Sequence, residues 1–455
     1  MSKTYRPWAP NQSWLLPPSP QDWLDEGDRV YVLLDAVNAL DLSAIRCKYD
    51  QESRGYRPYH PRMMVTLLLY AYCRGLYSLR KIQQVFEERV TFRVIVGPDI
   101  PNFRTISDFR KRPLPELADL FVQGLRLCQE AGLVKSGHVS LDGTKIKANA
   151  SRHKAMSYQR MQEEEKRLQQ AIYALLQQAE STDAQEDRRD GERRGDELPE
   201  ELARRESRLE RIQTAKRALE AQAKEGAQAE EARCDQKANE PAESPKGGRR
   251  ASPVSDEPKP QQQYDFTDPE SKIMKVNNKG WDQCGNAQAV VDEARQVIIA
   301  GEVTDAANDK QQVDPLMSQA QENIGDEESI DKALMDSGYF SESNVRWLEE
   351  RAMDGYVATA RIKHHERVPA HPRGRRPQDL TVKETMARKL RTKKGRETYS
   401  KRRGIVEPVF GQIKGARGFV RFSMRGLAQM KGEWSLVGLT HNLLKLFSVQ
   451  RLPVT

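Results

Sequence analysis

Cysteine is scarce in this chain, and its placement excludes two common stabilising devices. Five cysteines are spread over 455 residues, and no two of them form a Cys-x-x-Cys pair. Such scattering argues against a disulfide framework and against a zinc ribbon, and it fits a reducing compartment. The sequence also lacks any apolar run of the roughly 20 residues that a membrane-spanning helix needs. Together these absences predict a cytoplasmic protein with no membrane partner.

Aromatic residues are nearly missing from 152–262, which is instead dense in Glu, Arg, Gln, Lys and Ala. Its apolar residues recur at helical spacings in two series: Met161, Leu168, Ile172 and Leu175, then Leu202, Leu209, Ile212 and Leu219. This periodicity predicts two helices with a narrow apolar seam, packed as an antiparallel coiled hairpin. We expect 181–198 to join the two helices and 225–262 to be disordered.

Positive charge exceeds negative charge only modestly, with a formal net charge of +8. The excess makes a polyanionic partner such as DNA plausible, and its distribution is more informative than its sum. The densest basic stretch lies between Lys363 and Arg403. Its candidates for phosphate contacts are Lys393, Lys394, Lys401, Arg402 and Arg403. The alternative for this stretch is a disordered, solvated loop.

Residues 1–135 predict a set of short helices. Pro61 suits the first turn of one helix, and residues 78–86 have the pattern of the next. Short helices with tight glycine turns and basic outer faces resemble a helix-turn-helix module, with Arg80 and Arg110 as candidate DNA contacts. The alternative is a helical bundle that only supports its neighbour.

Strands and helices alternate in the remainder of the chain. The pattern predicts a strand at 138–147, a hairpin at 287–300, a strand that ends at Asp336, and a helix around 405–414. This order fits an α/β fold in which helices flank a central mixed sheet. The predicted regions are 1–135 as an N-terminal helical domain, 136–151 as the first strand of the core, 152–262 as a helical insertion and linker, and 263–455 as the rest of the core.

One acidic residue occupies a suggestive place on each of three elements. Asp142 lies near the middle of the first strand, Asp336 at the end of a later strand, and Glu407 in a helix that follows the basic stretch. Phosphoryl transfer on DNA uses two divalent ions about 4 Å apart, which hard carboxylate oxygens hold. Three carboxylates suffice, because Mg²⁺ keeps several waters. Each acid alone is more simply explained as a turn, cap or surface residue.

Several segments resemble the motifs of bacterial insertion-sequence transposases of the DDE type. The segments are Ser140–Ala150, Thr267–Lys275, Gly285–Asp292, Val303–Lys310, Met335–Phe340, and Arg403–Phe410 with Lys414. Residues 59–110 are similar to the helical domain that precedes the catalytic core in that family. The resemblance implies a ribonuclease-H-like core, and it implies Asp142, Asp336 and Glu407 as the catalytic residues that bind metal.

The same resemblance implies a DNA transposase, which cleaves the donor strand and joins the freed 3′-hydroxyl to target DNA. Its cofactor would be two Mg²⁺ or Mn²⁺ ions, and its partners the terminal inverted repeats of an insertion sequence and the target DNA. Because two ends must be held together, we expect a homodimer or larger assembly, associated with the bacterial nucleoid when bound to DNA. Two other functions stay open: a domesticated DNA-binding protein without catalysis, and a metal-dependent nuclease without strand transfer.

The signature around Glu407 departs from the family pattern in one place. The family has two residues between a tyrosine and an arginine and three between that arginine and the glutamate, whereas three residues separate Tyr399 from Arg403. Either Arg402 takes the role of the arginine with an offset, or Tyr399 is displaced. Arg403, Glu407 and Lys414 are spaced by four and seven residues, which predicts one face of one helix. On that face Arg403 and Lys414 are candidate contacts of the DNA phosphate backbone.

Overall fold

The structure is a computed structural model that describes residues 19–50, 58–112, 114–151, 154–186, 199–238, 256–276, 280–325, 328–360, 372, 377 and 379–450. The chain divides into two compact units: unit 1 is Met1–Ile146 with Gly285–Thr455, and unit 2 is Lys147–Cys284. Among the described residues, no helix is long and apolar enough to cross a membrane.

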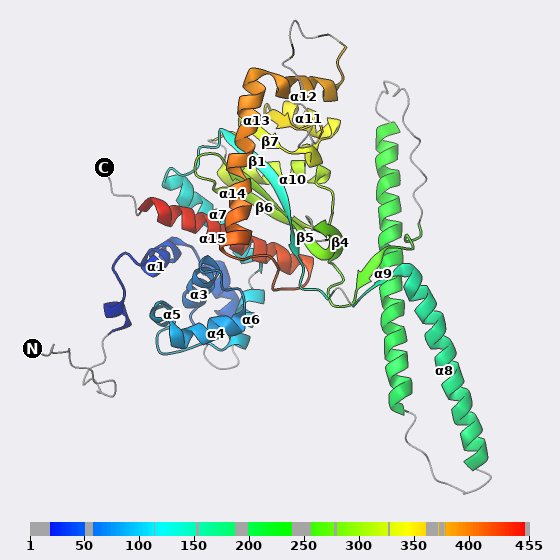
Figure 1. Cartoon of the computed structure of the whole chain (residues 1–455). Coiled ribbons are helices and arrows are strands. Elements are labelled where there is room, and N and C mark those ends of the chain that lie inside the picture. The colour runs from blue at the N-terminus through cyan, green and yellow to red at the C-terminus, as the bar shows by residue number, and fades with distance from the viewer. Residues whose placement is uncertain are drawn as a thin grey trace, which may run out of the picture. The chain divides into compact units, whose positions relative to one another are not determined.

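Unit 1 is a helical assembly around one sheet (Figure 1). Its helices before the first strand are η1 (Pro20–Trp23), α1 (Arg29–Ala39), α2 (Ser43–Asp50), α3 (Pro61–Cys73), α4 (Leu79–Glu88), α5 (Val90–Val96), α6 (Phe103–Lys111) and α7 (Leu114–Glu130). Its later helices are η3 (Lys310–Gln312), α10 (Val313–Ile324), η4 (Ser337–Tyr339), α11 (Glu342–Glu350), α12 (Val382–Arg391), α13 (Lys393–Ile405), α14 (Glu407–Gly411), the π-helical turn η5 (Gln412–Ala416) and α15 (Leu427–Gln450).

The sheet of unit 1 has the order β6-β5-β1-β7-β8 and is mixed. Its strands are β1 (His138–Lys147), β5 (Gly280–Asp292), β6 (Ile298–Thr304), β7 (Lys332–Met335) and β8 (Asp354–Val357). The pairs β1–β7 and β7–β8 are parallel, whereas β5 and β6 form an antiparallel hairpin. Parallel central strands must be covered on both faces, which explains why the apolar run Ala333–Met335 of β7 is fully buried.

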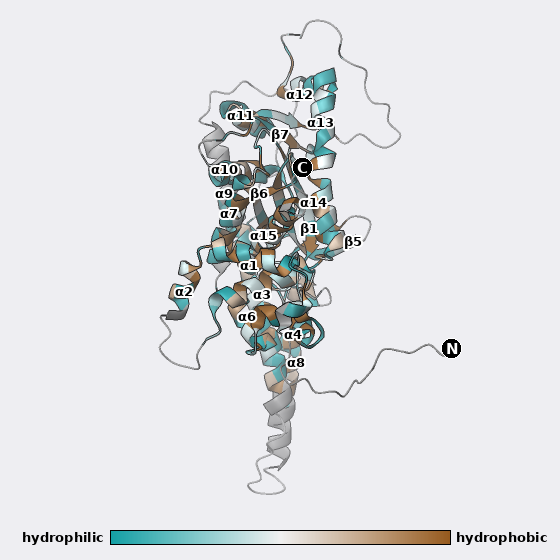
Figure 2. Ribbon diagram, turned by 90° about the vertical axis from the view of Figure 1, so that its left-hand side faces the viewer, coloured by the Kyte–Doolittle hydropathy of each residue, from teal (hydrophilic) through white to brown (hydrophobic). Residues whose placement is uncertain are grey.

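Helix α15 covers one part of this sheet, and polar side chains fix it there. It packs on β6 and on α7. The buried amide of Asn442 accepts a hydrogen bond from the backbone N–H of Ile298 at 2.9 Å and donates to the carbonyl of the same residue at 2.8 Å. The indole N–H of Trp434 donates to the carbonyl of Gln288 at 2.9 Å. Figure 2 shows hydrophobic residues concentrated where α15 and the strands lie, whereas α11, α12 and α13 are largely hydrophilic.

A buried ionic group joins the N-terminal helices to α15. Glu433 is fully buried, and its Oε1 accepts a hydrogen bond from the hydroxyl of Tyr72 on α3 at 2.7 Å. The guanidinium of Arg110 donates to the Tyr72 hydroxyl at 3.2 Å and lies 3.9 Å from Glu433. The backbone N–H of Ser423 donates to Glu433 Oε2 at 2.8 Å. The helices before the first strand are therefore tied to the sheet-covering helix by charge as well as by apolar packing.

Unit 2 is built on a helical hairpin (Figure 1). Its elements are β2 (Ala155–Ser157), α8 (Tyr158–Glu186), α9 (Pro199–Ala238), β3 (Gln263–Asp265) and β4 (Lys272–Val276). Helices α8 and α9 pack along the buried residues Met161, Leu168, Ile212, Ala215 and Leu219. At one end of the hairpin β2 and β3 form a two-stranded antiparallel sheet, and β4 pairs with the first half of β5.

The main predictions of fold are confirmed, and one is wrong in part. The mixed sheet flanked by helices, the N-terminal helices and the inserted helical hairpin are all present. The hairpin seam includes four of the eight predicted residues, with Leu209 partly buried beside it. Residues 225–238, predicted to be disordered, continue α9, because their Ala, Glu, Lys and Gln favour a helix. The joining segment 187–198 lies outside the described residues, as does 239–255.

Replacement of Glu433 by alanine tests the buried ionic group. We expect Glu433→Ala to lower the free energy of unfolding by about 3–5 kcal/mol, because Arg110 keeps its buried charge and loses its counter-charge. Chemical denaturation measures the loss, and the exposed Glu87 on α4 supplies the matched Glu87→Ala control. A Glu433→Ala protein as stable as the control would show that the ionic group does not hold the helices together.

Candidate active site

Two aspartates lie at neighbouring positions of paired parallel strands. In the register of β1 and β7, Leu141 is opposite Met335. Asp142 follows Leu141 in β1, and Asp336 follows Met335 directly after β7. Leu141 and Met335 are fully buried, and strand residues alternate in direction, which turns the two aspartates to the other face. The parallel register therefore brings together two acids that are far apart in the sequence.

Gly338 allows a third acid to approach the pair. Asp336 caps the short helix η4, and its Oδ1 accepts a hydrogen bond from the N–H of Gly338 at 2.8 Å. A Cβ atom added to Gly338 would lie 3.0 Å from Asp336 Oδ1 and 3.2 Å from Asp309 Oδ2. Both carboxylate oxygens border the same small space, which a larger residue at 338 would narrow.

Buried amides hold Asp309 in that place. Its Oδ1 accepts hydrogen bonds from the side chains of Asn286 at 2.6 Å and Gln288 at 2.8 Å. The ammonium group of Lys145 lies 3.6 Å from the same oxygen. The hydroxyl of Tyr339 donates to the amide oxygen of Gln288, so that the amide orientation of Gln288 is fixed from both ends.

Gly143 brings this network up against Asp142. A Cβ atom at Gly143 would come within 2.4 Å of Gln288 Nε2, too close for any side chain without a shift of Gln288. The glycine that follows Asp142 is thus needed for the close approach of β1 to the Gln288 side chain.

Asp336 and Asp309 act electrostatically on Asp142. Burial raises the pKa of Asp142 to about 6. The positive charge of Arg402 opposes this rise, and the negative charge of Asp336 adds to it. Asp309 raises it further. Burial raises the pKa of Tyr339 well above its usual range, and Asp309, Asp142 and Asp336 add to the effect. A site with concentrated negative charge and little water favours a bound cation.

Arg402 supplies the positive charge that faces Asp142. Its Nη1 donates to Asp142 Oδ2 at 3.0 Å, and both side chains are mostly buried. Tyr399 forms a side-chain hydrogen bond with Arg402 one turn earlier on α13. Arg403 is exposed. Of the two alternatives for the signature, the structure therefore favours Arg402 as the partner of Tyr399, with two residues between them.

Glu407 does not lie on the helix that carries Arg402 and Arg403. Helix α13 ends at Ile405, and α14 begins at Glu407. Pro408 explains the break, because it has no N–H to donate to the carbonyl of Gly404. The side chain of Gln296 donates to that carbonyl instead, at 2.8 Å. The prediction of one helix for Arg403, Glu407 and Lys414 is therefore wrong.

The structure does not bring Glu407 into contact with the aspartates. Glu407 is exposed and has no hydrogen-bond or ion-pair partner among the described residues. Over the same residues, no group of three or more His, Cys, Asp or Glu side chains is gathered closely enough to hold a metal ion. Asp142, Asp336 and Asp309 nevertheless offer hard oxygen donors of the kind that Mg²⁺ and Mn²⁺ prefer. The donor chemistry fits a divalent metal.

Lys414 contacts β1 at Thr144, the second residue after Asp142. Its ammonium group donates to the hydroxyl of Thr144 and, at 2.8 Å, to the carbonyl of Lys145. Lys414 belongs to the π-helical turn η5, whose widened ring is closed by a bond from Arg417 N–H to the Gln412 carbonyl at 3.0 Å. Lys414 thus anchors this segment to the strand that carries Asp142.

The other basic residues predicted to contact DNA differ in exposure. Lys393 and Lys394 are exposed at the start of α13, and Lys401 pairs with Glu293 at 2.8 Å. Arg80 is exposed, with its guanidinium 5.3 Å from the ring centre of Phe103. Arg110 is only 4 % exposed, and the prediction that it contacts DNA is wrong because its guanidinium is committed to Tyr72 and Glu433.

Sequence reasoning missed the network around Asp309. A faint signal was present: Gln288 interrupts the apolar run 287–291 with a polar residue, and Asn286 stands just before it. A polar side chain in a buried strand needs a partner, but the sequence does not say which residue supplies it. In the sequence, Asp309 is marked only by its place in the motif Val303–Lys310.

The fold and the paired aspartates define a class, the nucleic-acid-processing enzymes that have a ribonuclease-H-like sheet and depend on divalent metal. Comparison with known families narrows this class. Residues 18–112 match a family model described as Transposase domain (DUF772), and residues 252–443 match one described as Transposase DDE domain. The chain belongs to the DDE-type transposases of insertion sequences and is a DNA transposase. Neither a curated protein nor a solved structure matches the chain significantly.

The two matched segments include Asp336 and Glu407 but not Asp142. The assignment of Asp142 therefore depends on its register beside Asp336 and on its ion pair with Arg402.

Substitution of Arg402 and of Arg403 by alanine tests which of the two arginines interacts with Asp142. Because the folded pKa of Asp142 is about 6 and that of an unfolded Asp about 3.9, Asp142 contributes stability that is full below about pH 4 and is lost as pH rises through 6. In EDTA, Arg402→Ala should extend this loss to higher pH, since the pKa of Asp142 rises further. Arg403→Ala should leave the profile unchanged.

The measurement is the free energy of unfolding between pH 4 and 8, with Asp142→Asn as the background that removes the titrating group. Equal profiles for Arg402→Ala and Arg403→Ala would contradict the assignment of Arg402.

Proposed function

We propose that Asp142, Asp336 and Glu407 are the catalytic carboxylates of this transposase and that they hold two Mg²⁺ or Mn²⁺ ions. The observation that carries the proposal is the parallel register that sets Asp142 beside Asp336, with Arg402 on Asp142. The resemblance of Arg403–Phe410 to the signature of the family supports Glu407, whose side chain is exposed.

The ions would activate a water for donor-strand hydrolysis and stabilise the leaving 3′ oxygen, and the freed 3′-hydroxyl would then attack target DNA. The chain's own residues orient these groups. Arg402 neutralises part of the charge on Asp142 and donates to its Oδ2, while the Gly143 N–H donates to Oδ1 at 2.9 Å, so that both oxygens are oriented and each keeps a lone pair for a ligand. Tyr399 in turn bonds with Arg402.

Asp309 acts in this proposal as a positioning residue or a further ligand beside Asp336. Asn286, Gln288 and Tyr339 orient it from behind, as the outer partners of metal ligands do. Lys414 fixes the segment after Glu407 to β1.

The DNA surface would include the exposed Lys393 and Lys394, together with Lys401, Arg403 and Arg80. Each phosphate contact adds a salt-dependent increment of affinity through counterion release. Joining two transposon ends to one target requires at least two active sites, and we propose a homodimer or larger assembly on DNA.

Alanine variants of the three carboxylates test the proposal. Asp142→Ala, Asp336→Ala and Glu407→Ala should each lower the rate of donor cleavage and of strand transfer in Mg²⁺ by at least about 10³-fold, because each removes a ligand that stabilises the transition state. Binding to the transposon end in EDTA should stay as in the parent protein. A plasmid that carries the matched inverted repeats gives both readouts.

Glu397→Ala is the matched control, because Glu397 is an exposed glutamate on α13. Cleavage that survives in Glu407→Ala would remove Glu407 from the triad and leave Asp309 as the third ligand. Cleavage without any strand transfer by the parent protein would reduce the function to that of a nuclease.

Substitution of Asp309 tests whether this residue contributes to metal binding. Asp309→Asn keeps the shape and removes the charge, and we expect it to weaken Mg²⁺ binding and activity by about 10- to 100-fold. Calorimetric titration with Mg²⁺ provides a readout that is separate from turnover. The control is Asp305→Asn, an exposed aspartate on the same loop. Unchanged Mg²⁺ affinity in Asp309→Asn would exclude a role at the metal site.

A further inference from the structure

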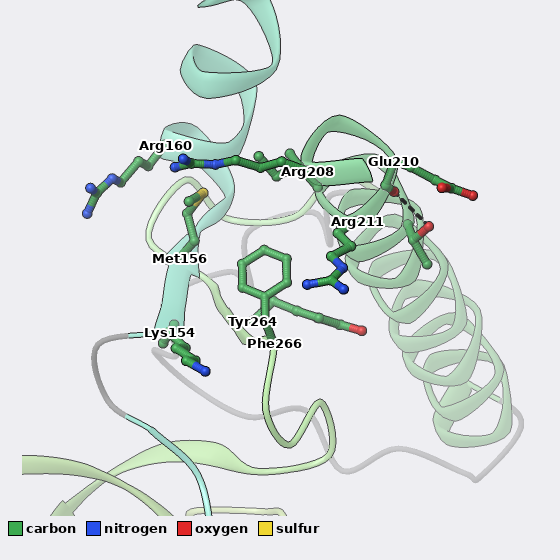
Figure 3. Close-up of a pocket in the computed structure, with 11 residues that line it drawn as sticks. Lys154, Met156, Arg160, Arg208, Glu210, Arg211, Tyr264 and Phe266 are labelled. Carbon is green, nitrogen blue, oxygen red and sulfur yellow. Dashed lines mark hydrogen bonds between the residues drawn. The ribbon is translucent and has the colours of Figure 1, made fainter. Parts of the chain in front are cut away.

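A cavity of about 760 Å³ lies within unit 2, where the small sheet β2–β3 meets α8 and α9. Figure 3 shows residues that line it. It is assembled from segments that are far apart in the sequence, since Met156 and Arg160 precede the hairpin loop and Tyr264 and Phe266 follow α9. The cavity is separate from the residues proposed for catalysis, all of which belong to unit 1.

Aromatic rings form the apolar part of the cavity. Tyr264 and Phe266 meet edge to face, with ring centres 5.6 Å apart. Together with Met156 they pack on one side against the hairpin core, but each remains partly exposed on the other side. Packing against the core holds the rings in place, so that their free surface is ready to accept a flat apolar partner.

Positive charge surrounds these rings. Lys154, Arg160, Arg208 and Arg211 line the cavity, against one acidic side chain, that of Glu210. In Figure 3 the ring of Phe266 lies between Met156 and the guanidinium of Arg211, and Lys154 lies below it. An electropositive rim around aromatic rings is the combination that binds nucleotides, because phosphates need cations and bases need rings.

Three ion pairs occupy charges elsewhere on the described part of the hairpin. Glu164 binds both Arg167 and Arg208, at 2.8 and 2.9 Å, and Glu165 binds Lys216 at 3.1 Å. In contrast, Lys154, Arg160 and Arg211 form no ion pair within the part of the chain that the structure describes. Three cations without an ion-pair partner among the described residues therefore line the cavity, and the guanidinium of Arg211 lies beside its aromatic rings (Figure 3).

We propose that this cavity is a second DNA-binding site of the transposase, which takes an unpaired nucleotide of a DNA strand. Phe266 and Tyr264 stack on the base, and Lys154, Arg160 and Arg211 contact the adjoining phosphates. The site gives the helical insertion a role in DNA binding that is separate from cleavage. Stacking tolerates every base, so the site has little sequence preference.

Fluorescence anisotropy of a labelled single-stranded oligonucleotide with the full-length protein tests the site. In EDTA, Phe266→Leu should weaken binding by roughly 5- to 100-fold without changing its salt dependence, because a ring is lost and no charge. Arg211→Gln should weaken binding and reduce the slope of log affinity against log salt by about 0.7, the increment for one phosphate contact on a single strand. Because the assay contains no divalent metal, its outcome is independent of the catalytic carboxylates.

Arg217→Gln is the matched control, an exposed arginine on α9 that does not line the cavity, and it should bind as the parent protein does. Thermal melting shows whether each variant is folded, and the surface position of Arg211 keeps the test valid if Phe266→Leu fails to fold. In the parent protein, an oligonucleotide that contains 5-iododeoxyuridine should crosslink to Tyr264 or Phe266.

Three results would overturn the proposal. One is parent-like binding by Arg211→Gln. Another is a loss in Arg211→Gln that a folded Phe266→Leu does not share, since a surface for phosphates alone needs no ring. The third is weakened binding to duplex DNA with unchanged binding to the single strand, because paired bases cannot reach the rings.

Discussion

The burial of an aspartate close to other carboxylates is the constraint on which the rest of the site depends. The parallel pairing of β1 with β7 places Asp142 beside Asp336, and Asp309 approaches the same space from the loop before α10. Burial and the neighbouring acids raise the pKa of Asp142 to about 6 despite the opposing charge of Arg402. A fold that holds acids together at this cost must also supply what offsets it: the guanidinium on Asp142, the amides on Asp309 and, when it is bound, a divalent cation.

The helix break at Val406 places Glu407 in a different structural setting from Asp142 and Asp336. Asp142 and Asp336 are fixed by strands, and Glu407 begins a short helix whose start is determined by Pro408. Gln296 satisfies the carbonyl that the proline leaves open, and Lys414 ties the following turn to β1. The segment is anchored on both sides of Glu407 while the carboxylate itself stays exposed. This arrangement suits a ligand that completes its site when DNA and metal are present.

The sequence was sufficient for those features that depend on local pattern. Alternating apolar residues predicted the strands, the spacing of Met161, Leu168, Ile212 and Leu219 predicted the helical hairpin, and motif resemblance predicted the family. It failed where the outcome depended on tertiary partners. By sequence Arg110 has the pattern of a surface cation, but in the fold it is buried beside Glu433, which lies more than three hundred residues later in the chain. The network of Gln288 and Asp309 and the cavity beside Phe266 each join segments that are distant in the sequence. The spacing of apolar residues does not predict such contacts.

In the proposed mechanism Asp142, Asp336 and Glu407 hold the same metal site. Anomalous diffraction from a crystal of the full-length protein bound to transposon-end DNA and soaked in Mn²⁺ tests it most directly. We expect manganese between Asp142 and Asp336, with Glu407 among the ligands of the site. Manganese bound away from the two aspartates, or a site completed by Asp309 while Glu407 stays in solvent, would contradict it.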